Sequence, residues 1–84
     1  MENDEQIKKL VFRSKDWEIS SLLYATNRTL CESEWVNGVC YFVFDDRTSC
    51  EELISEFYKG EIVIDARDLF DGIRTIKNIL RGKH

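Results

Sequence analysis

Asn37-Gly38 constrains the fold of this 84-residue chain more than any other feature of the sequence. The two residues lie between strand-like runs, and both accept the positive φ angles that a two-residue type I′ turn requires. The dipeptide therefore predicts a β-hairpin over about residues 29–45. Such a turn also sets the register, so opposed residues share a face of the sheet. The predicted pairs are Val36–Val39, Trp35–Cys40, Glu34–Tyr41, Ser33–Phe42, Glu32–Val43 and Cys31–Phe44.

This register divides the hairpin into two unlike faces. The mainly apolar inner face, on which we expect helices to pack, consists of Cys31, Ser33, Trp35, Cys40, Phe42 and Phe44. The outer hairpin face consists of Glu32, Glu34, Val36, Val39, Tyr41 and Val43. It is too apolar for a plain solvent-facing surface and too charged for a sealed core. Either neighbours of the first strand cover part of it, or it meets a partner.

The segments around the hairpin predict a strand and two helices. Residues 9–13 are short, apolar and partly β-branched, as in a first strand. Ser14 can cap a helix that runs to about Thr26. Its core face is Ile19, Leu22 and Leu23, beside a half-covered face with Trp17 and Tyr24.

After the hairpin, the capping box of Thr48 and Glu51 predicts a helix over about residues 49–59 that ends at Gly60. Its apolar stripe is Cys50, Leu53, Ile54 and Phe57.

A last helix is predicted over about residues 66–81, capped by Asp65 and ended by Gly82. Its expected core side chains are Leu69, Phe70, Ile73, Ile76 and Leu80. Gly72 in its interior costs up to about 1 kcal/mol relative to alanine, which indicates either close packing or an accident of surface sequence. The extended link at 61–64 is a candidate fourth strand.

Together these elements predict an α+β fold, in which a small antiparallel sheet of N-terminal strand and hairpin is packed on one face by three helices. Residues 1–6 are expected to form a flexible tail, and residues 7–84 a single domain, because no linker or repeat divides them. No apolar run approaches the ~20 residues of a membrane helix, and the acidic start does not resemble a secretory signal. We therefore expect a soluble, cytoplasmic protein.

The sequence predicts neither an enzyme nor a bound cofactor. Cys31, Cys40 and Cys50 lack CxxC spacing and the one histidine is His84, so neither a zinc site nor a base for a catalytic thiol is expected. The thiols are predicted to be buried and unreactive. Acids gather at Asp45-Asp46, at Glu51-Glu52 and at Asp65, Asp68 and Asp71. They could hold magnesium or act as an acid–base pair, but capping and helix-dipole roles explain them better.

Charge is unevenly distributed in a chain of net charge −4. Residues 1–61 hold 13 acids against 7 bases, whereas residues 62–84 hold 3 acids against 5 bases. A basic stripe on the last helix, made of Arg67, Arg74, Lys77 and Arg81, could bind phosphates. Cations near a helix C-terminus also suit the helix dipole, and Asp71 can pair with Arg74.

The C-terminal half resembles a family of short uncharacterised proteins of bacteria, phages and mobile elements. The resemblance is carried by Tyr41–Asp46, Glu52–Gly60, Asp65–Leu69 and Ile76–Leu80: a phenylalanine-rich strand ending in acid, a Phe-Tyr-x-Gly turn, an Asp-Ala-Arg helix start and a lysine-bearing last helix. It draws attention to Phe57, Tyr58, Asp65 and Arg67. It implies a small phage or mobile-element product, often an adaptor or an inhibitor of host machinery.

Two functions are consistent with these features. The preferred hypothesis is a non-enzymatic interaction protein that uses the outer hairpin face to bind a protein partner, or a second copy of itself in a homodimer. Inhibition of host defence is one outcome of such binding. The alternative is nucleic-acid or nucleotide binding through the basic stripe.

Overall fold

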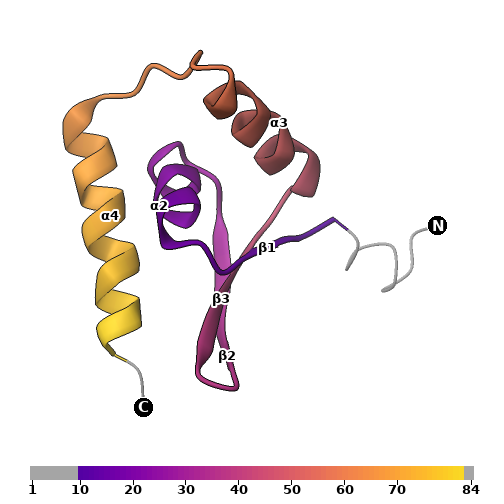
Figure 1. The fold of residues 1–84 in the computed structure, drawn as a ribbon, viewed down its shortest axis with the longest axis vertical. Coiled ribbons are helices and arrows are strands. Elements are labelled where there is room, and N and C mark those ends of the chain that lie inside the picture. The colour runs from indigo at the N-terminus through magenta and orange to yellow at the C-terminus, as the bar shows by residue number, and fades with distance from the viewer. Residues whose placement is uncertain (1–9, 83–84) are drawn as a thin grey trace.

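The computed structural model describes residues 10–82 and has an α+β fold with a three-stranded antiparallel sheet and three helices (Figure 1). The elements in chain order are β1 (Phe12–Ser14), α2 (Trp17–Ala25), β2 (Leu30–Val36), β3 (Val39–Phe44), α3 (Arg47–Tyr58) and α4 (Ala66–Arg81). The predicted tail at 1–6 lies outside the described residues, as does Lys9 of the predicted first strand.

The hairpin turn has the predicted geometry. Asn37 and Gly38 both have positive φ, 51° and 82°. Beyond the turn, the five predicted pairs from Val36–Val39 to Glu32–Val43 are all confirmed. The two-residue turn thus sets the faces of the sheet over most of the hairpin.

The sixth predicted pair is wrong. Phe44 pairs with Leu30 instead of Cys31, because a bulge between Leu30 and Glu32 takes Cys31 out of the ladder. The thiol of Cys31 is consequently exposed and does not belong to the inner face. A turn controls register only until an extra residue is inserted in one strand.

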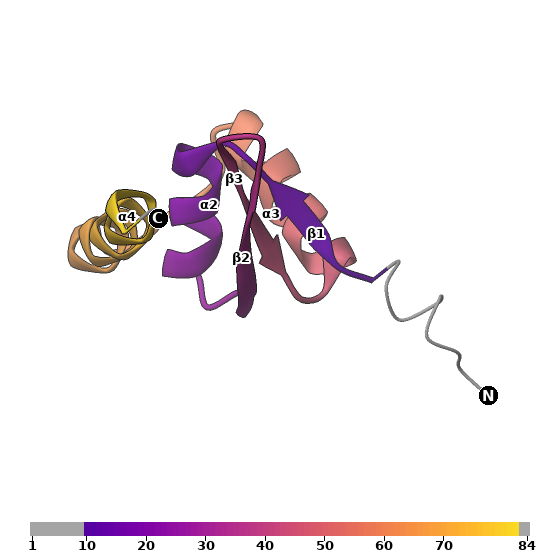
Figure 2. The same ribbon diagram turned by 90° about the horizontal axis from the view of Figure 1, so that it is seen from below.

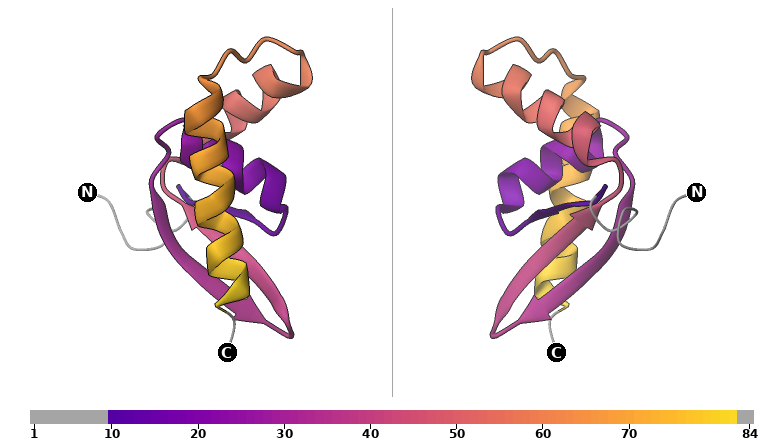
Figure 3. Two further views of the ribbon diagram at one scale, coloured as in Figure 1. Left: turned by 90° about the vertical axis from the view of Figure 1, so that its left-hand side faces the viewer. Right: turned by 90° about the vertical axis from the view of Figure 1, so that its right-hand side faces the viewer.

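β3 is the central strand, between β1 and β2. β1 pairs with β3 from Phe12–Phe44 to Ser14–Phe42. Because β1 reaches only this far, the end of the hairpin extends beyond it, in the direction of the C-terminal end of α4 (Figure 3).

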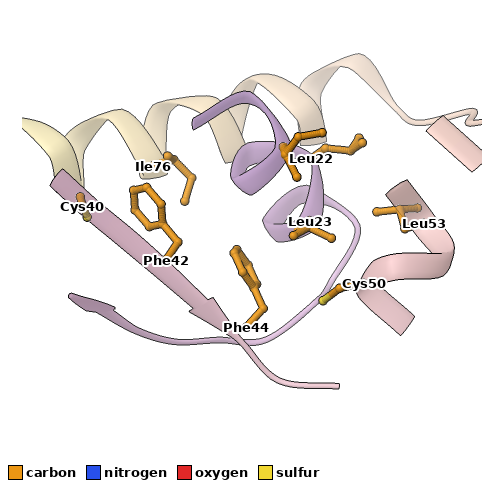
Figure 4. Packing of buried hydrophobic residues seen from close by; sticks show 9 residues of the cluster. Leu22, Leu23, Cys40, Phe42, Phe44, Cys50, Leu53 and Ile76 are labelled. Carbon is orange, nitrogen blue, oxygen red and sulfur yellow. The ribbon is translucent and has the colours of Figure 1, made fainter. Parts of the chain in front are cut away.

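The core lies between the inner face of the sheet and the helices (Figure 4). Phe42 and Phe44 of β3, Leu23 of α2, Cys50 of α3 and Ile76 of α4 are completely buried. Full burial of a large apolar side chain contributes roughly 1.5–3 kcal/mol. α2 lies between α4 and α3, and α4 packs mainly on α2 (Figures 1 and 2).

This arrangement corrects two predicted core positions. Phe70 is 60% exposed and Phe57 is 43% exposed. α4 buries the line through Gly72 and Ile76 against α2, so Phe70 falls outside its contact surface. Residues 61–64 form no strand in the described sheet, and Val63 is 98% exposed, so the segment is a link between α3 and α4.

Aspartates cap all three helices, and two of them replace predicted caps. Asp16 caps α2 by accepting hydrogen bonds from the amides of Glu18 and Ile19, whereas Ser14 Oγ accepts one from the amide of Asp16. Asp46, not Thr48, caps α3. Asp65 caps α4 as predicted, and α4 ends at Gly82.

Candidate functional site

The outer hairpin face is open at one end and covered at the other. At the turn, Val36 and Val39 are 41% and 40% exposed. Val43, at the far end, is only 6% exposed, so its place in the predicted contact surface is wrong. The reason is its position in the central strand, where Arg13 of β1 and Glu32 of β2 flank it.

Arg13 organises the middle of this face. Its Nη2 donates to Oε1 of Glu34 at 2.7 Å, and its guanidinium carbon lies 4.6 Å from the centroid of the Tyr41 ring. Both members of the ion pair remain about half exposed, so the pair adds little stability. It brings Glu34 and Tyr41 together beside the exposed valines.

The basic stripe on α4 is only partly available. Arg67 and Arg81 are exposed, and Arg74 is exposed but donates to Oδ1 of Asp71 at 2.7 Å. Lys77 is turned toward α2, with its Nζ 4.3 Å from the centroid of the Trp17 ring. The four predicted cations therefore do not form one free surface.

The cysteines divide into two environments. Cys40 and Cys50 are buried as predicted, and burial raises the pKa of both thiols. Cys31 is exposed, contrary to the prediction, and its pKa is also raised, by partial burial and then by the negative charges of Asp45 and Glu32.

Five of the acids that the sequence left open as metal ligands or catalytic groups make local structural contacts: Glu51 pairs with Arg47, Asp71 pairs with Arg74, Asp65 caps α4, and the other two are Asp45 and Asp46. Asp45 accepts a hydrogen bond from the amide of Asp46, and Asp46 caps α3. Within residues 10–82, no group of three or more cysteine, aspartate, glutamate or histidine side chains could hold a metal ion.

The structure also forms an apolar surface that was not predicted from the sequence. A groove of about 380 Å³ lies where three helices meet, and we call it the aromatic groove. Its apolar walls come from Trp17, Ile19 and Leu22 of α2, Phe57 and Tyr58 of α3, and Leu69 and Ile73 of α4. Trp17, Phe57 and Tyr58 are 36%, 43% and 73% exposed.

One pattern in the sequence points toward this groove. Phe57 and Tyr58 are adjacent on a helix, so their side chains are about 100° apart and cannot both lie on one narrow buried stripe. Phe57 lies four residues after Leu53 and three after Ile54, a spacing that is typical of a buried helix face. This spacing predicts Phe57 as a core residue, so the exposed aromatic pair was not recognised.

These features define a small α+β protein with two exposed apolar surfaces, one on the sheet and one on the helices. No helix among residues 10–82 combines the length and apolar character needed to cross a bilayer. A scan against protein-family models gives no match, and searches of curated proteins and of solved structures give no significant match. The resemblance of the C-terminal half to a phage and mobile-element family therefore stays a prediction.

Proposed function

We propose that this protein is a non-enzymatic interaction module that binds a protein partner through the outer hairpin face. The observation that carries the proposal is the exposure of Val36 and Val39, a directly opposed aliphatic pair next to the turn. β-branched residues usually occupy positions where a sheet is packed against something, and here the described chain leaves both about 40% exposed.

The surroundings of this valine pair suit a protein interface. Such interfaces combine an apolar, aromatic-rich centre with a polar rim. Val36, Val39 and the half-buried Tyr41 supply the centre, while Glu32, Glu34 and Arg13 supply charges beside it. Val43 is left out of the contact surface because it is buried.

Nucleic-acid binding through the basic stripe is the weaker alternative. Asp71 neutralises Arg74, and Lys77 is engaged by Trp17, which leaves Arg67 and Arg81 as the more available cations. Few phosphate contacts release few counterions, so binding through these two cations alone would be weak. A gel shift at low salt that is lost in Arg74→Glu/Arg81→Glu would favour this alternative, and the absence of any shift would remove it.

The identity of the partner is a further part of the proposal. That it belongs to host machinery, with the protein acting as an adaptor or inhibitor, rests on the resemblance of the C-terminal half. A homodimer through the same face is the other form that the interaction can take, and the solution mass measured by sedimentation distinguishes the two.

The test compares partner capture by matched variants in the natural host. Tagged wild-type protein, Val36→Lys/Val39→Lys and Val63→Lys are expressed, and co-purifying proteins are identified by mass spectrometry. Val63 is the control, since it is 98% exposed and lies in the link, away from the sheet. We expect one partner to be captured by wild type and by Val63→Lys but lost from the double variant. Equal capture by all three would rule out this surface.

A further inference from the structure

We infer that the aromatic groove is a second docking surface, separate from the outer hairpin face, and that its occupant is an amphipathic segment of another protein with lysine or arginine beside its apolar side chains. The groove is formed by helices that pack on the inner side of the sheet. It therefore lies apart from Val36 and Val39, and a ligand here need not touch them.

The groove has a buried floor and exposed aromatic walls. Ile19 and Leu22 are only 8% and 6% exposed and connect the groove to the core. Above them, Trp17 and the pair Phe57 and Tyr58 remain open to solvent. Large aromatic side chains that surround a pocket without filling it are typical of positions that anchor a bound partner.

Local geometry holds the Phe57–Tyr58 wall in position. The two rings are in edge-to-face contact, with centroids 5.2 Å apart and planes at 64°. Directly after them, α3 ends in a Schellman motif: Gly60, at φ 75°, donates to the carbonyl of Phe57, and Glu61 donates to that of Glu56. A wall fixed in this way loses little conformational entropy when a ligand binds.

Trp17 is held in a similar manner by Lys77, whose ammonium lies over its ring. Cation–π contacts of this kind contribute modestly at exposed sites, and this one places the ammonium of Lys77 against a face of the ring. The walls from α2 and from α3 thus both make contacts within the protein before a ligand binds.

Charge specifies the ligand. The charged residues among those that line the groove are Asp16 and Glu18, both acidic, and the whole chain has net charge −4. Lys77 is the cation beside the groove, and its ammonium is already engaged by the Trp17 ring. Asp16 is hydrogen-bonded to two amides as the helix cap, while the carboxylate of Glu18 has no bonded partner among the described residues. Cationic groups flanking an apolar anchor would complement this rim. A second copy of the chain fits less well, because a two-fold contact through this face would bring two acidic rims together.

The size of the groove favours a short segment over a folded domain. Its volume of about 380 Å³ accommodates a few large side chains. An amphipathic helix can place apolar side chains at positions i, i+3 and i+4 in the groove from one of its faces.

The test uses two synthetic helical peptides, one composed of leucine and lysine and one of leucine and glutamate in the same pattern, with binding measured by calorimetry. We expect the leucine/lysine peptide to bind and the leucine/glutamate peptide not to bind. Phe57→Ala/Tyr58→Ala should weaken the binding about tenfold or more. Its matched control, Val63→Ala/Phe70→Ala, removes two exposed apolar residues that do not line the groove and should leave the affinity unchanged.

Two more variants separate this inference from non-specific attraction and from the proposed function. Glu18→Gln should lower the affinity for the leucine/lysine peptide more than Glu52→Gln does. Glu52→Gln removes the same charge from a site that does not line the groove. Val36→Lys/Val39→Lys should bind the peptide as the wild type does. Loss of the partner bound at the outer hairpin face can therefore be told apart from loss of peptide binding in the groove.

Several results would overturn the inference. Equal binding of both peptides, or equal weakening by the groove double variant and its control, would show that the groove is not the binding site. Concentration-dependent dimerisation that Phe57→Ala/Tyr58→Ala abolishes would assign the groove to a second copy of the chain and exclude the cationic segment as its occupant.

Discussion

Gly72 of α4 lies against the backbone of Ser21 in α2, so closely that a Cβ at position 72 would be 2.8 Å from the carbonyl oxygen of Ser21 and 3.0 Å from Cβ of Ala25. Of the two explanations that the sequence left open for this glycine, close packing is the correct one. The missing side chain lets α4 approach α2, which brings Ile76 into the core.

Gly72→Ala should destabilise the protein even though alanine is the better helix former. The helix propensity gain is at most about 1 kcal/mol, whereas forcing the two backbones apart costs roughly 1–3 kcal/mol. We expect a net loss in the free energy of unfolding, measured by urea titration. Gly82→Ala is the control, because its Cβ would make only ordinary contacts at 3.5 and 3.6 Å and its φ is negative. A Gly72→Ala protein as stable as wild type would contradict the close-packing explanation.

Gly38→Ala should destabilise the hairpin for a conformational reason alone. Its φ is 82°, and nothing lies within 4 Å of an added Cβ. The left-handed conformation costs an L-residue with a side chain about 1–2 kcal/mol, so a loss of this size is expected in thermal or urea unfolding. Asn37→Gly, which keeps the same turn, should be close to neutral. Similar effects of the two substitutions would argue against the turn geometry.

The thiols should differ in reactivity in the native state. Cys31 is exposed, whereas Cys40 and Cys50 are buried. An aromatic disulfide reagent should therefore modify a single thiol in the folded protein, and all three of the chain in guanidinium chloride. Cys31→Ser should abolish the reaction of the folded protein, because the two remaining thiols are buried and react slowly. A fast reaction in that variant would show that a buried cysteine is accessible.

Stability should fall in alkaline solution because of the buried thiols. Burial raises the pKa of Cys40 and Cys50 above the ordinary value of 9.0. Above that pH the unfolded chain loses protons that the native thiols retain, so unfolding becomes more favourable as pH rises. Below pH 9.0 the thiols are protonated in both the native and the unfolded state, so their contribution to the free energy of unfolding is fully present. Urea titrations on either side of pH 9.0 measure the decline, which should be smaller in Cys50→Ala.

Prediction from the sequence succeeded where the determinant is local. A two-residue turn, an aspartate before a helix and a glycine after one act through torsion angles and hydrogen bonds within a few residues. The hairpin register near the turn, the Asp65 cap and the ends of α3 and α4 were therefore predictable. The competing caps at Asp16 and Asp46 were missed because several polar residues could serve, and the path of the chain into each helix selects one.

The candidate surfaces depended on contacts between distant segments. Val43 shares a face with Val36, but only the pairing of β3 with both β1 and β2 buries the first and leaves the second exposed. The aromatic groove requires α2, α3 and α4 to meet at one point, which no periodicity within a single helix encodes.

By itself, then, the sequence determined which segments are helices and strands, where most of them end, and which hairpin residues share a face, because these properties follow from backbone conformation over short distances. Only the tertiary structure decided which apolar side chains stay outside the core. α4 packs on α2 along Gly72 and Ile76, and that contact leaves Phe70 exposed. Burial is a property of how whole elements pack together, so one sequence pattern can describe both a core residue and a binding residue.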